Sequence, residues 1–268
     1  MRIYPITKLL TMAAAFAVVT SVHAQEQSVY SVNIVGFQSM DLPEGGKLDL
    51  VASPFESGGN TLSEIFGTEA LTGSESPGGA DRLRFWDPSE QTYVNVGVGP
   101  DGNFYRQTAQ GSWVTPLEQV DFPMDLTEGV WIVGAASAPE GRKLTLAGDV
   151  VMDDELSYNF TEGLHMVAYP FSSSIALQDM NFFESGASGA ESPGGADRFR
   201  AWDRSAQTYV NYGLGPDGQW YSQTAAGAWV IPLEPSTYVL EPGQAFFYFS
   251  QGSFTWDVSN PYLSSLND

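Results

Sequence analysis

The sequence predicts an all-β protein made of two tandem homologous β-sandwich or small-barrel modules, each with one short helix. First, residues 75–118 return 116 positions later as residues 191–234, with 32 of 44 positions identical. A long fixed period of this kind indicates a repeated structural unit. Second, short apolar segments rich in β-branched and aromatic residues recur roughly every 8 to 15 residues between Gly and Pro turn signals, as in sandwiches and barrels. Third, 28 glycines and 13% aromatic residues suit a β protein with many turns.

Residues 1–24 have the features of a secretory signal peptide. Arg2 and Lys8 precede an apolar run, and Val22-His23-Ala24 is an acceptable cleavage site, so we expect the mature chain to begin at Gln25. The alternative is an uncleaved anchor helix, but a spanning helix needs about 20 apolar residues. An exported chain without cysteine depends on its core alone. This suits a secreted or periplasmic protein of a Gram-negative bacterium better than a small eukaryotic ectodomain.

The mature chain is strongly acidic. Removing the two basic residues of the leader leaves nine Lys and Arg against 32 Asp and Glu, a net charge of −23. Nucleic acids and anionic membranes need a basic surface, so neither is an expected partner, and no second apolar run is long enough to span a membrane. The charge favours solubility in salty water or, as an alternative, binding of a specific cation.

The first module is expected over residues 25–141. Residues 61–64 (TLSE) form a capping box before a short helix at residues 62–66. The turn signal Gly99-Pro100-Asp101-Gly102 predicts a hairpin. The expected strands cover residues 32–37, 48–55, 82–87, 91–98, 103–107, 113–115 and 130–134.

The pattern then restarts, which predicts a second module over residues 142–258 and a loose tail over 259–268. Residues 143–151 are expected to take the place of the strand at 32–37, and residues 164–171 match 48–55. Residues 177–183 match the short helix, and residues 245–249 close the module as residues 130–134 close the first.

The most informative stretch is ADRLRFWD. Strand alternation places Leu83 and Phe85 on one face and Arg82, Arg84 and Trp86 on the other. In the second copy both inward residues change and none of the outward ones does. The candidate binding residues are therefore Arg82, Arg84, Trp86, Arg198, Arg200 and Trp202.

Two interpretations of this outward face remain open. Arginine stems can simply cover tryptophan rings on one side of a sheet, and a recent duplication would leave both faces alike. Alternatively, the face is a contact surface for a polysaccharide, for the other module or for neighbouring molecules, because Trp and Arg are enriched in binding hot spots. Further aromatic residues could extend such a platform, although large aromatics are usually buried; they are Tyr93, Tyr105, Trp113, Tyr209, Tyr221 and Trp229.

Metal and catalytic signals are weak. Six recurring aspartates could serve a hard cation such as calcium, but their spacing fits turn capping and arginine pairing better; they are Asp81, Asp87, Asp101, Asp197, Asp203 and Asp217. His165 is the one histidine outside the leader, and the first copy has Asp49 in its place. With one histidine and no cysteine, a zinc site or a histidine-based triad lacks partners. We expect no enzyme activity and no cofactor, with a carboxylate-pair glycosidase as a third possibility.

Four stretches resemble a known exported module: YSVNIVGF, LDLVASPF, RFWDPSEQTYV and LTEGVWIV, in that order. They are similar to a recurrent β-rich module of secreted proteins of verrucomicrobial and planctomycete type, with VNxVG, LxANPF-like, WD and PGxGFWV-like strands. The closing motif fits best at residues 242–247 (PGQAFF) and departs at residues 127–131 (TEGVW). The resemblance covers nearly all of residues 29–258. It implies an exported β module of unknown function and no catalytic residues.

We therefore expect an exported, non-catalytic structural or interaction protein of the cell envelope or extracellular matrix. It would act through contacts with envelope or matrix proteins, or through self-association. Carbohydrate binding through surface Trp and Arg is the alternative.

Overall fold

Two five-stranded antiparallel sheets, one from each half of the chain, carry most of the strands. The computed structural model describes residues 34–264, so the predicted signal peptide lies outside the described residues. The sheet of the first half has the order β2–β7–β4–β5–β6. Its strands are β2 (Leu48–Val51), β7 (Val130–Val133), β4 (Arg82–Asp87), β5 (Thr92–Val98) and β6 (Phe104–Gln107).

The sheet of the second half has the equivalent order, β10–β16–β12–β13–β14. Its strands are β10 (Gly163–Ala168), β16 (Ala245–Ser250), β12 (Arg198–Asp203), β13 (Thr208–Leu214) and β14 (Trp220–Gln223). The registers correspond as well: Arg84 pairs with Asn95, and Arg200 pairs with Asn211, 116 positions later in each strand. The all-β fold class is confirmed, and the copied block forms the same three-stranded unit in both halves.

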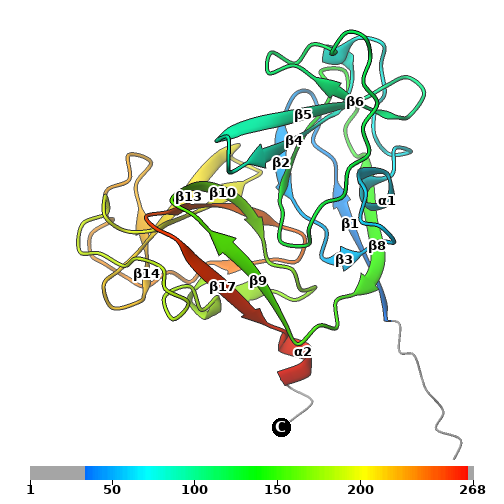
Figure 1. The fold of residues 1–268 in the computed structure, drawn as a ribbon. Helices are drawn as coiled ribbons and strands as arrows, with labels where there is room; N and C mark the ends of the chain where they lie inside the picture. The colour runs from blue at the N-terminus through cyan, green and yellow to red at the C-terminus, as the bar shows by residue number, and fades with distance from the viewer. Residues whose placement is uncertain (1–33, 265–268) are drawn as a thin grey trace, which may run out of the picture. The chain divides into compact units, whose positions relative to one another are not determined.

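A smaller sheet covers the core of each half. In the first half it has the order β1–β8–β3, and in the second half β17 pairs with β9, as Figure 1 shows. The bounds are β1 (Val35–Asp41), β3 (Phe55–Glu56), β8 (Lys143–Val150), β9 (Glu155–Phe160) and β17 (Phe254–Ser259). A two-stranded ladder, β11 (Ile175–Ala176) with β15 (Val239–Leu240), completes the sheets.

The pairing of β8 corrects one expectation. Residues 143–151 were expected to open the second module, but β8 pairs with β1 along all seven residues of β1 and also with β3. It is therefore the last strand of the first half, which we take as residues 34–150, and the second half as residues 151–264. Alternation identifies a strand but not its partner, because the same pattern suits either sheet. The strand that opens the second half is β9, which the sequence analysis missed.

The cores lie between the large and the small sheet of each half. Leu83 and Phe85 are buried in the first core, and Phe199 and Ala201 are buried in the second, which confirms their predicted inward direction. In the second core Phe199 stacks on Phe246 with ring centroids 4.4 Å apart. The two halves therefore fill equivalent cores with different side chains, as cores tolerate when total volume is kept.

Helical structure is sparse, as expected. Helix α1 (Leu62–Phe66) begins after Thr61, and the Glu64 carboxylate accepts the Thr61 backbone N–H at 3.1 Å. The corresponding segment of the second half is only the 3₁₀ turn η2 (Leu177–Asp179). The remaining helical pieces are η1 (Pro77–Gly79) and α2 (Pro261–Ser264). Within residues 34–264 no helix is long and apolar enough to cross a membrane.

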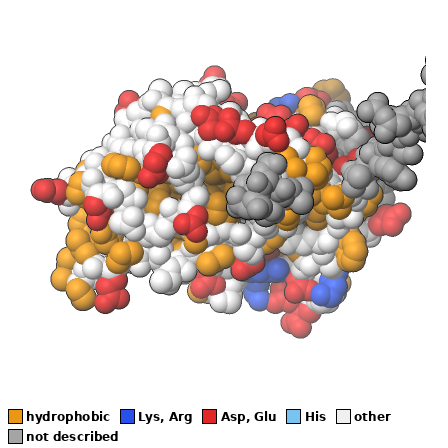
Figure 2. Space-filling view, turned by 90° about the horizontal axis from the view of Figure 1, so that it is seen from below, with side chains coloured by type: hydrophobic (Ala, Val, Ile, Leu, Met, Phe, Trp, Pro, Cys, Tyr) orange, Lys and Arg blue, Asp and Glu red, His pale blue; other side chains and the backbone are white. Residues whose placement is uncertain are grey.

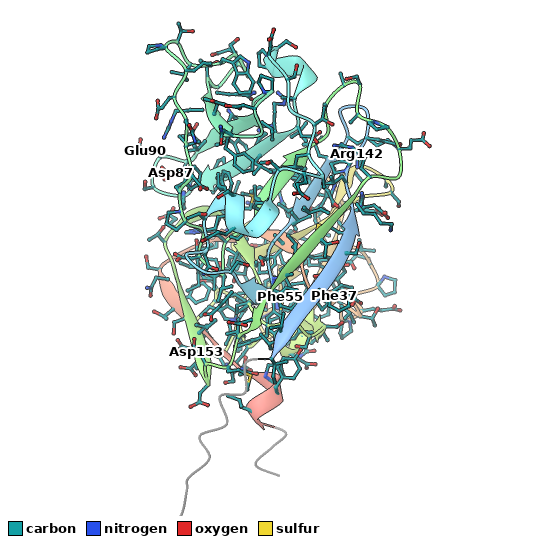
Figure 3. The ribbon with its side chains drawn as sticks, turned by 90° about the vertical axis from the view of Figure 1, so that its right-hand side faces the viewer. Phe37, Phe55, Asp87, Glu90, Arg142 and Asp153 are labelled. Atoms are coloured by element: carbon teal, nitrogen blue, oxygen red, sulfur yellow. The ribbon has the colours of Figure 1, made fainter. Side chains whose placement is uncertain are left out.

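A buried ion pair ties the start of β8 to the large sheet of the first half. Asp81 is fully buried and forms an ion pair with Arg142, which Figure 3 labels at one end of β8. Asp81 also accepts the backbone N–H of Thr72 and that of Ala135, each at 2.7 Å. The Arg142 guanidinium donates in addition to the Pro43 carbonyl at 2.9 Å. Removing one partner of such a pair leaves an uncompensated buried charge.

We predict that Arg142→Ala lowers the free energy of unfolding by about 3–5 kcal/mol, because the buried Asp81 carboxylate loses its cation. Urea denaturation followed by circular dichroism measures the change. Lys143→Ala is the matched control, since Lys143 and Asp41 form an exposed ion pair at 3.0 Å. That control should leave the free energy of unfolding nearly unchanged, because an exposed ion pair is screened by solvent. Equal losses of unfolding free energy in the two variants would contradict a stabilising role for the buried Asp81–Arg142 ion pair.

Candidate binding surfaces

The six candidate residues lie on β4 and β12, on the face of each large sheet that points away from its own core. All six are half-buried. Both strands are central in their sheets, so side chains on this face have neighbours on either side. Trp86 and Trp202 contact the other half of the chain. The outward face is thus a contact surface between the two halves, which is one of the interpretations that the sequence left open.

The two tryptophans make reciprocal hydrogen bonds. Trp86 Nε1–H donates to the Leu164 carbonyl at 2.6 Å, and Trp202 Nε1–H donates to the Leu48 carbonyl at 3.2 Å. Each member of the second pair lies 116 positions from its counterpart in the first. The two contacts are therefore related as in a two-fold symmetric interface, where the same patch serves both partners.

Two glutamines complete the same contacts. The Gln91 side-chain amide donates to the Leu164 carbonyl at 3.0 Å and accepts the Leu164 N–H at 3.2 Å. The Gln207 amide does the same with Leu48, at 2.9 Å for both bonds. Both glutamines have a left-handed backbone, with φ of 51° and 50°. No sequence motif predicted this role for the two glutamines, although both are unchanged within the copied block.

Two backbone bridges between the halves are also related by the 116-residue offset. Val51 of β2 bridges to Gln244, and Val167 of β10 bridges to Glu128. These two bridges are again 116 positions apart at both ends. Strands β2 and β10 end their sheets, so the bridges cover part of an edge that would otherwise be open.

Aromatic rings fill the space between the two faces. Trp131 meets Trp202 edge-to-face at 4.8 Å, and Trp86 meets Tyr93 at 4.8 Å and Phe247 at 6.4 Å. Such pairs contribute about 0.5–1.5 kcal/mol each beyond the burial of their area. The buried members of this cluster are Leu50, Ala52, Trp131, Met166, Ala168, Ala245 and Phe247. Leu48, Trp86, Tyr93, Leu164, Trp202 and Tyr209 pack against them.

The four arginines border this cluster without a carboxylate partner. Within residues 34–264 none of Arg82, Arg84, Arg198 and Arg200 forms an ion pair. Arg84 lies over the Tyr93 ring at 4.3 Å, and Arg198 lies over the Phe249 ring at 4.3 Å. Burial, and then the neighbouring Arg84, lowers the pKa of Arg82, but an arginine remains charged at any physiological pH. Two of the four arginines thus cover rings within the fold, but the rings are those of Tyr93 and Phe249 and not the tryptophan rings that the structural interpretation expected.

A crevice of about 470 Å³ lies between the halves and is lined in part by Trp202. Its lining includes the carboxylate of Asp49, on β2. Burial raises the pKa of Asp49 to about 6, against the opposing effects of Arg204 and of the Leu50 N–H. Arg204, from the second half, approaches the Asp49 carboxylate at 3.2 Å. The crevice thus contains an ion pair between the two halves, and Trp86 does not line it.

The two halves differ at this point. His165 occupies the position equivalent to Asp49, and it is buried, with Nδ1 3.1 Å from the Tyr158 hydroxyl and Nε2 2.8 Å from the Thr161 carbonyl. Burial lowers the pKa of His165, so the neutral ring is favoured near neutral pH. Its contacts make it a residue of the second core.

The recurring aspartates serve turns and buried contacts. Asp87 accepts the N–H groups of Ser89 and Glu90 in the β4–β5 turn, where Figure 3 labels Asp87 and Glu90. Asp203 accepts from the Ala206 N–H and from the Ser205 hydroxyl in the equivalent turn. The Ser89 hydroxyl also donates to Asp87 at 2.6 Å, and this bond and then the Glu90 N–H lower the pKa of Asp87. The Ala206 N–H and then the Ser205 hydroxyl lower the pKa of Asp203. Among the residues described, no group of three His, Asp or Glu side chains is placed to hold a metal ion.

The remaining aromatic candidates separate into two places. Tyr93 and Tyr209 lie in the contact between the halves. The other four aromatic residues form two edge-to-face pairs outside that contact. Tyr105 pairs with Trp113 by the β5–β6 hairpin, and Tyr221 pairs with Trp229 by the β13–β14 hairpin. A single aromatic platform that includes all six residues is therefore not present.

We predict that Trp86→Ala and Trp202→Ala each lower the free energy of unfolding, by up to about 3 kcal/mol, because each removes a ring and a donor from the shared cluster. Trp86→Phe, which keeps a ring but loses the bond to Leu164, should cost about 1 kcal/mol. Guanidinium denaturation with far-UV and near-UV circular dichroism measures both. A loss below about 0.5 kcal/mol for both alanine variants, as for ordinary surface positions, would contradict the packing role.

The raised pKa of Asp49 gives a prediction for stability against pH. The folded state holds this proton more firmly than the unfolded state, whose ordinary value is 3.8. Its contribution to stability is therefore fully present below pH 4 and is lost as the pH rises to about 6. The difference in unfolding free energy between the wild type and Asp49→Asn should change over this interval, by on the order of 1–3 kcal/mol. A difference in unfolding free energy that stays constant from pH 4 to pH 7 would rule out a raised pKa for Asp49 in the folded protein.

Comparison with known proteins adds no family. No protein-family model matches the chain, and a search of the curated proteins found no match.

Proposed function

We propose that this protein is an exported, non-catalytic component of the cell envelope or extracellular matrix that acts through protein–protein contacts, including contacts between copies of itself. The proposal does not use Trp86 or Trp202 as ligand platforms, since both rings already pack between the halves. The contact surface must therefore lie elsewhere on the molecule.

The observation that carries the proposal is an apolar outer face on the small sheet of the first half. Val35 is 68% exposed and Phe37 is 79% exposed, and the two lie on the same side of β1. Phe37 pairs across the ladder with Ala147, which is also exposed. Figure 3 looks onto this sheet and labels Phe37. The rest of this face is polar, with Asp149 opposite Val35 and Thr145 opposite Ser39, so the apolar patch is confined to the first residues of β1 and to Ala147. An exposed apolar patch with a polar rim marks interaction sites in soluble proteins.

The equivalent face of the second half is polar, which makes the apolar face of the first half specific. The outward side chains of β9 and β17 there form cross-strand polar pairs. Ser157 donates to Asp257 at 2.6 Å, and Thr255 donates to Asn159 at 2.8 Å. In the second half the outer face of the small sheet is thus covered by polar side chains. The fold therefore does not require apolar side chains at the positions of Val35 and Phe37.

Strand β1 also ends its sheet. The order β1–β8–β3 leaves one side of β1 without a partner strand among the residues described. An edge strand offers backbone donors and acceptors that can add a strand from another molecule. The exposed apolar side chains beside this edge would then supply the desolvated part of the contact.

We predict that Phe37→Ser weakens association without weakening the fold, because an exposed side chain contributes within about 0.5 kcal/mol to stability. Light scattering after size exclusion of the mature protein, over a range of concentration and salt, measures the assembly. Retention on an isolated envelope fraction is the second readout. Asn159→Ala, on the equivalent polar face, is the matched control and should leave both readouts unchanged. A wild type that stays monomeric throughout and binds no envelope fraction would defeat the proposal.

A further inference from the structure

We propose that each half of the chain carries an equivalent surface site for a neutral polysaccharide, at the β5–β6 hairpin of the first half and the β13–β14 hairpin of the second. This site is separate from the β1 face of the proposed function, and either can exist without the other. In the first half it is a pocket of about 350 Å³. Its lining includes Glu75, Pro100, Asp101, Tyr105, Trp113 and Leu117.

The two rings of this pocket are held in fixed positions. Trp113 Nε1–H donates to the Glu75 carbonyl at 2.8 Å, and the Tyr105 hydroxyl donates to Asp101 at 2.8 Å. Both rings rest directly on glycine backbone. A Cβ at Gly97 would lie 2.6 Å from the Trp113 ring, and one at Gly99 would lie 2.6 Å from the Tyr105 ring. The rings are therefore pre-organised, which lowers the entropic cost of binding.

The second half repeats this arrangement. Trp229 Nε1–H donates to the Glu191 carbonyl at 2.8 Å, and the Tyr221 hydroxyl donates to Asp217 at 2.7 Å. The ring centroids of Tyr221 and Trp229 are 6.2 Å apart, as are those of Tyr105 and Trp113. The outer wall is apolar and exposed in both halves, with Leu117 at 62% and Leu233 at 50%.

Recent duplication alone does not account for the agreement, because changes surround the pocket on the surface and in the core. Beneath the pocket Phe104 is replaced by Trp220, and beside it Arg106 by Ser222 and Thr115 by Ile231. Of the lining, only Ser74 differs, with Ala190 in its place. Both halves therefore share the two aromatic rings, the aspartate that accepts from the tyrosine, the Gly-Pro turn before it, the glutamate and the exposed leucine. In the first half these residues are Tyr105, Trp113, Asp101, Gly99, Pro100, Glu75 and Leu117.

The chemistry of the shared residues selects the ligand class. The planes of the two fixed rings are 75° apart in the first half and 79° apart in the second, so one ring can stack on the apolar face of a sugar while the other borders the sugar's edge. Ionised carboxylates accept hydrogen bonds from the sugar hydroxyl groups. Hydrogen bonds from Asn103 and Tyr105 lower the pKa of Asp101, so this acceptor is charged. The nearby cation of the first half, Arg106, is paired with Glu118 at 3.0 Å and is a serine in the second half. Arg82 and Arg198 pair across the sheet with Gly97 and Gly213 in both halves, but no Lys or Arg is among the residues that line the pocket. A polyanion would thus meet carboxylates in the lining itself, which favours a neutral polymer.

Two equivalent sites on one chain fit a ligand that repeats. A polysaccharide presents the same unit many times, so both sites can bind one polymer or cross-link two. Simultaneous binding raises the overall affinity by about 10²–10⁴ over a single site when the geometry allows it.

The test is affinity electrophoresis of the full mature chain in native gels that contain one polymer each. The neutral probes are a β-glucan, a xylan and a glucomannan, and alginate and a sulfated galactan serve as anionic probes. Proline-rich peptides also bind to grooves lined by aromatic rings, so binding of such a peptide is measured by a fluorescence titration. We expect at least one neutral polymer to retard the wild type. Trp113→Ala alone should weaken retardation by about tenfold or more, through loss of bivalence.

Trp113→Ala combined with Trp229→Ala should abolish retardation. Leu117→Asp combined with Leu233→Asp changes only exposed side chains and should do the same in a folded protein, as circular dichroism would verify. Met152→Ala, an exposed apolar residue outside both sites, is the control and should bind as the wild type does. Retardation by no neutral polymer, by anionic polymers alone, binding of the peptide alone, or wild-type behaviour of both double variants would each overturn the proposal.

Discussion

The contact between two like faces is the constraint on which the rest of this structure depends. Each large sheet has one face on its own core and the other on the opposite half, through Trp86, Trp202 and the glutamine amides. In an arrangement of this symmetry one patch serves as both partners. This gives a physical reason why the outward residues Arg82, Arg84 and Trp86 of β4 are unchanged in β12 while Leu83 and Phe85 are replaced. Core positions repack within one half, whereas a change on the shared face alters a contact with the other.

Departures from the symmetry create the surfaces that distinguish the halves. Asp49 faces Arg204 across a crevice, whereas its counterpart His165 is enclosed by Tyr158 and Thr161. The small sheets differ in the same way, since β1 and β8 expose Val35, Phe37 and Ala147 where β9 and β17 expose polar pairs. Acidic side chains are spread over the face seen in Figure 2, and basic ones are few. Duplication thus supplies the architecture, and divergence at a few positions supplies separate surfaces.

Much of the fold could be predicted from the sequence, because local patterns specify local structure. The β4–β5–β6 unit, the short helix after Thr61 and the inward direction of Leu83 were all predicted from alternation, turns and capping. Which strand pairs with β8 could not be predicted, because β8 has the same alternation whichever sheet it joins. The Arg-Trp face was identified, but its partner was not, since a pattern within one strand holds no information on what lies opposite. The roles of Gln91 and Gln207 depend on a left-handed turn conformation that their residue type does not announce.

The measurement that tests the central claim most directly is scanning calorimetry of the purified chain. If the shared face joins the halves into one cooperative unit, unfolding is a single transition, with a calorimetric enthalpy equal to the van't Hoff enthalpy. Tryptophan fluorescence and far-UV circular dichroism should then give the same midpoint. Two resolved transitions, with a van't Hoff enthalpy near half the calorimetric value, would show that the halves fold independently and would contradict the account.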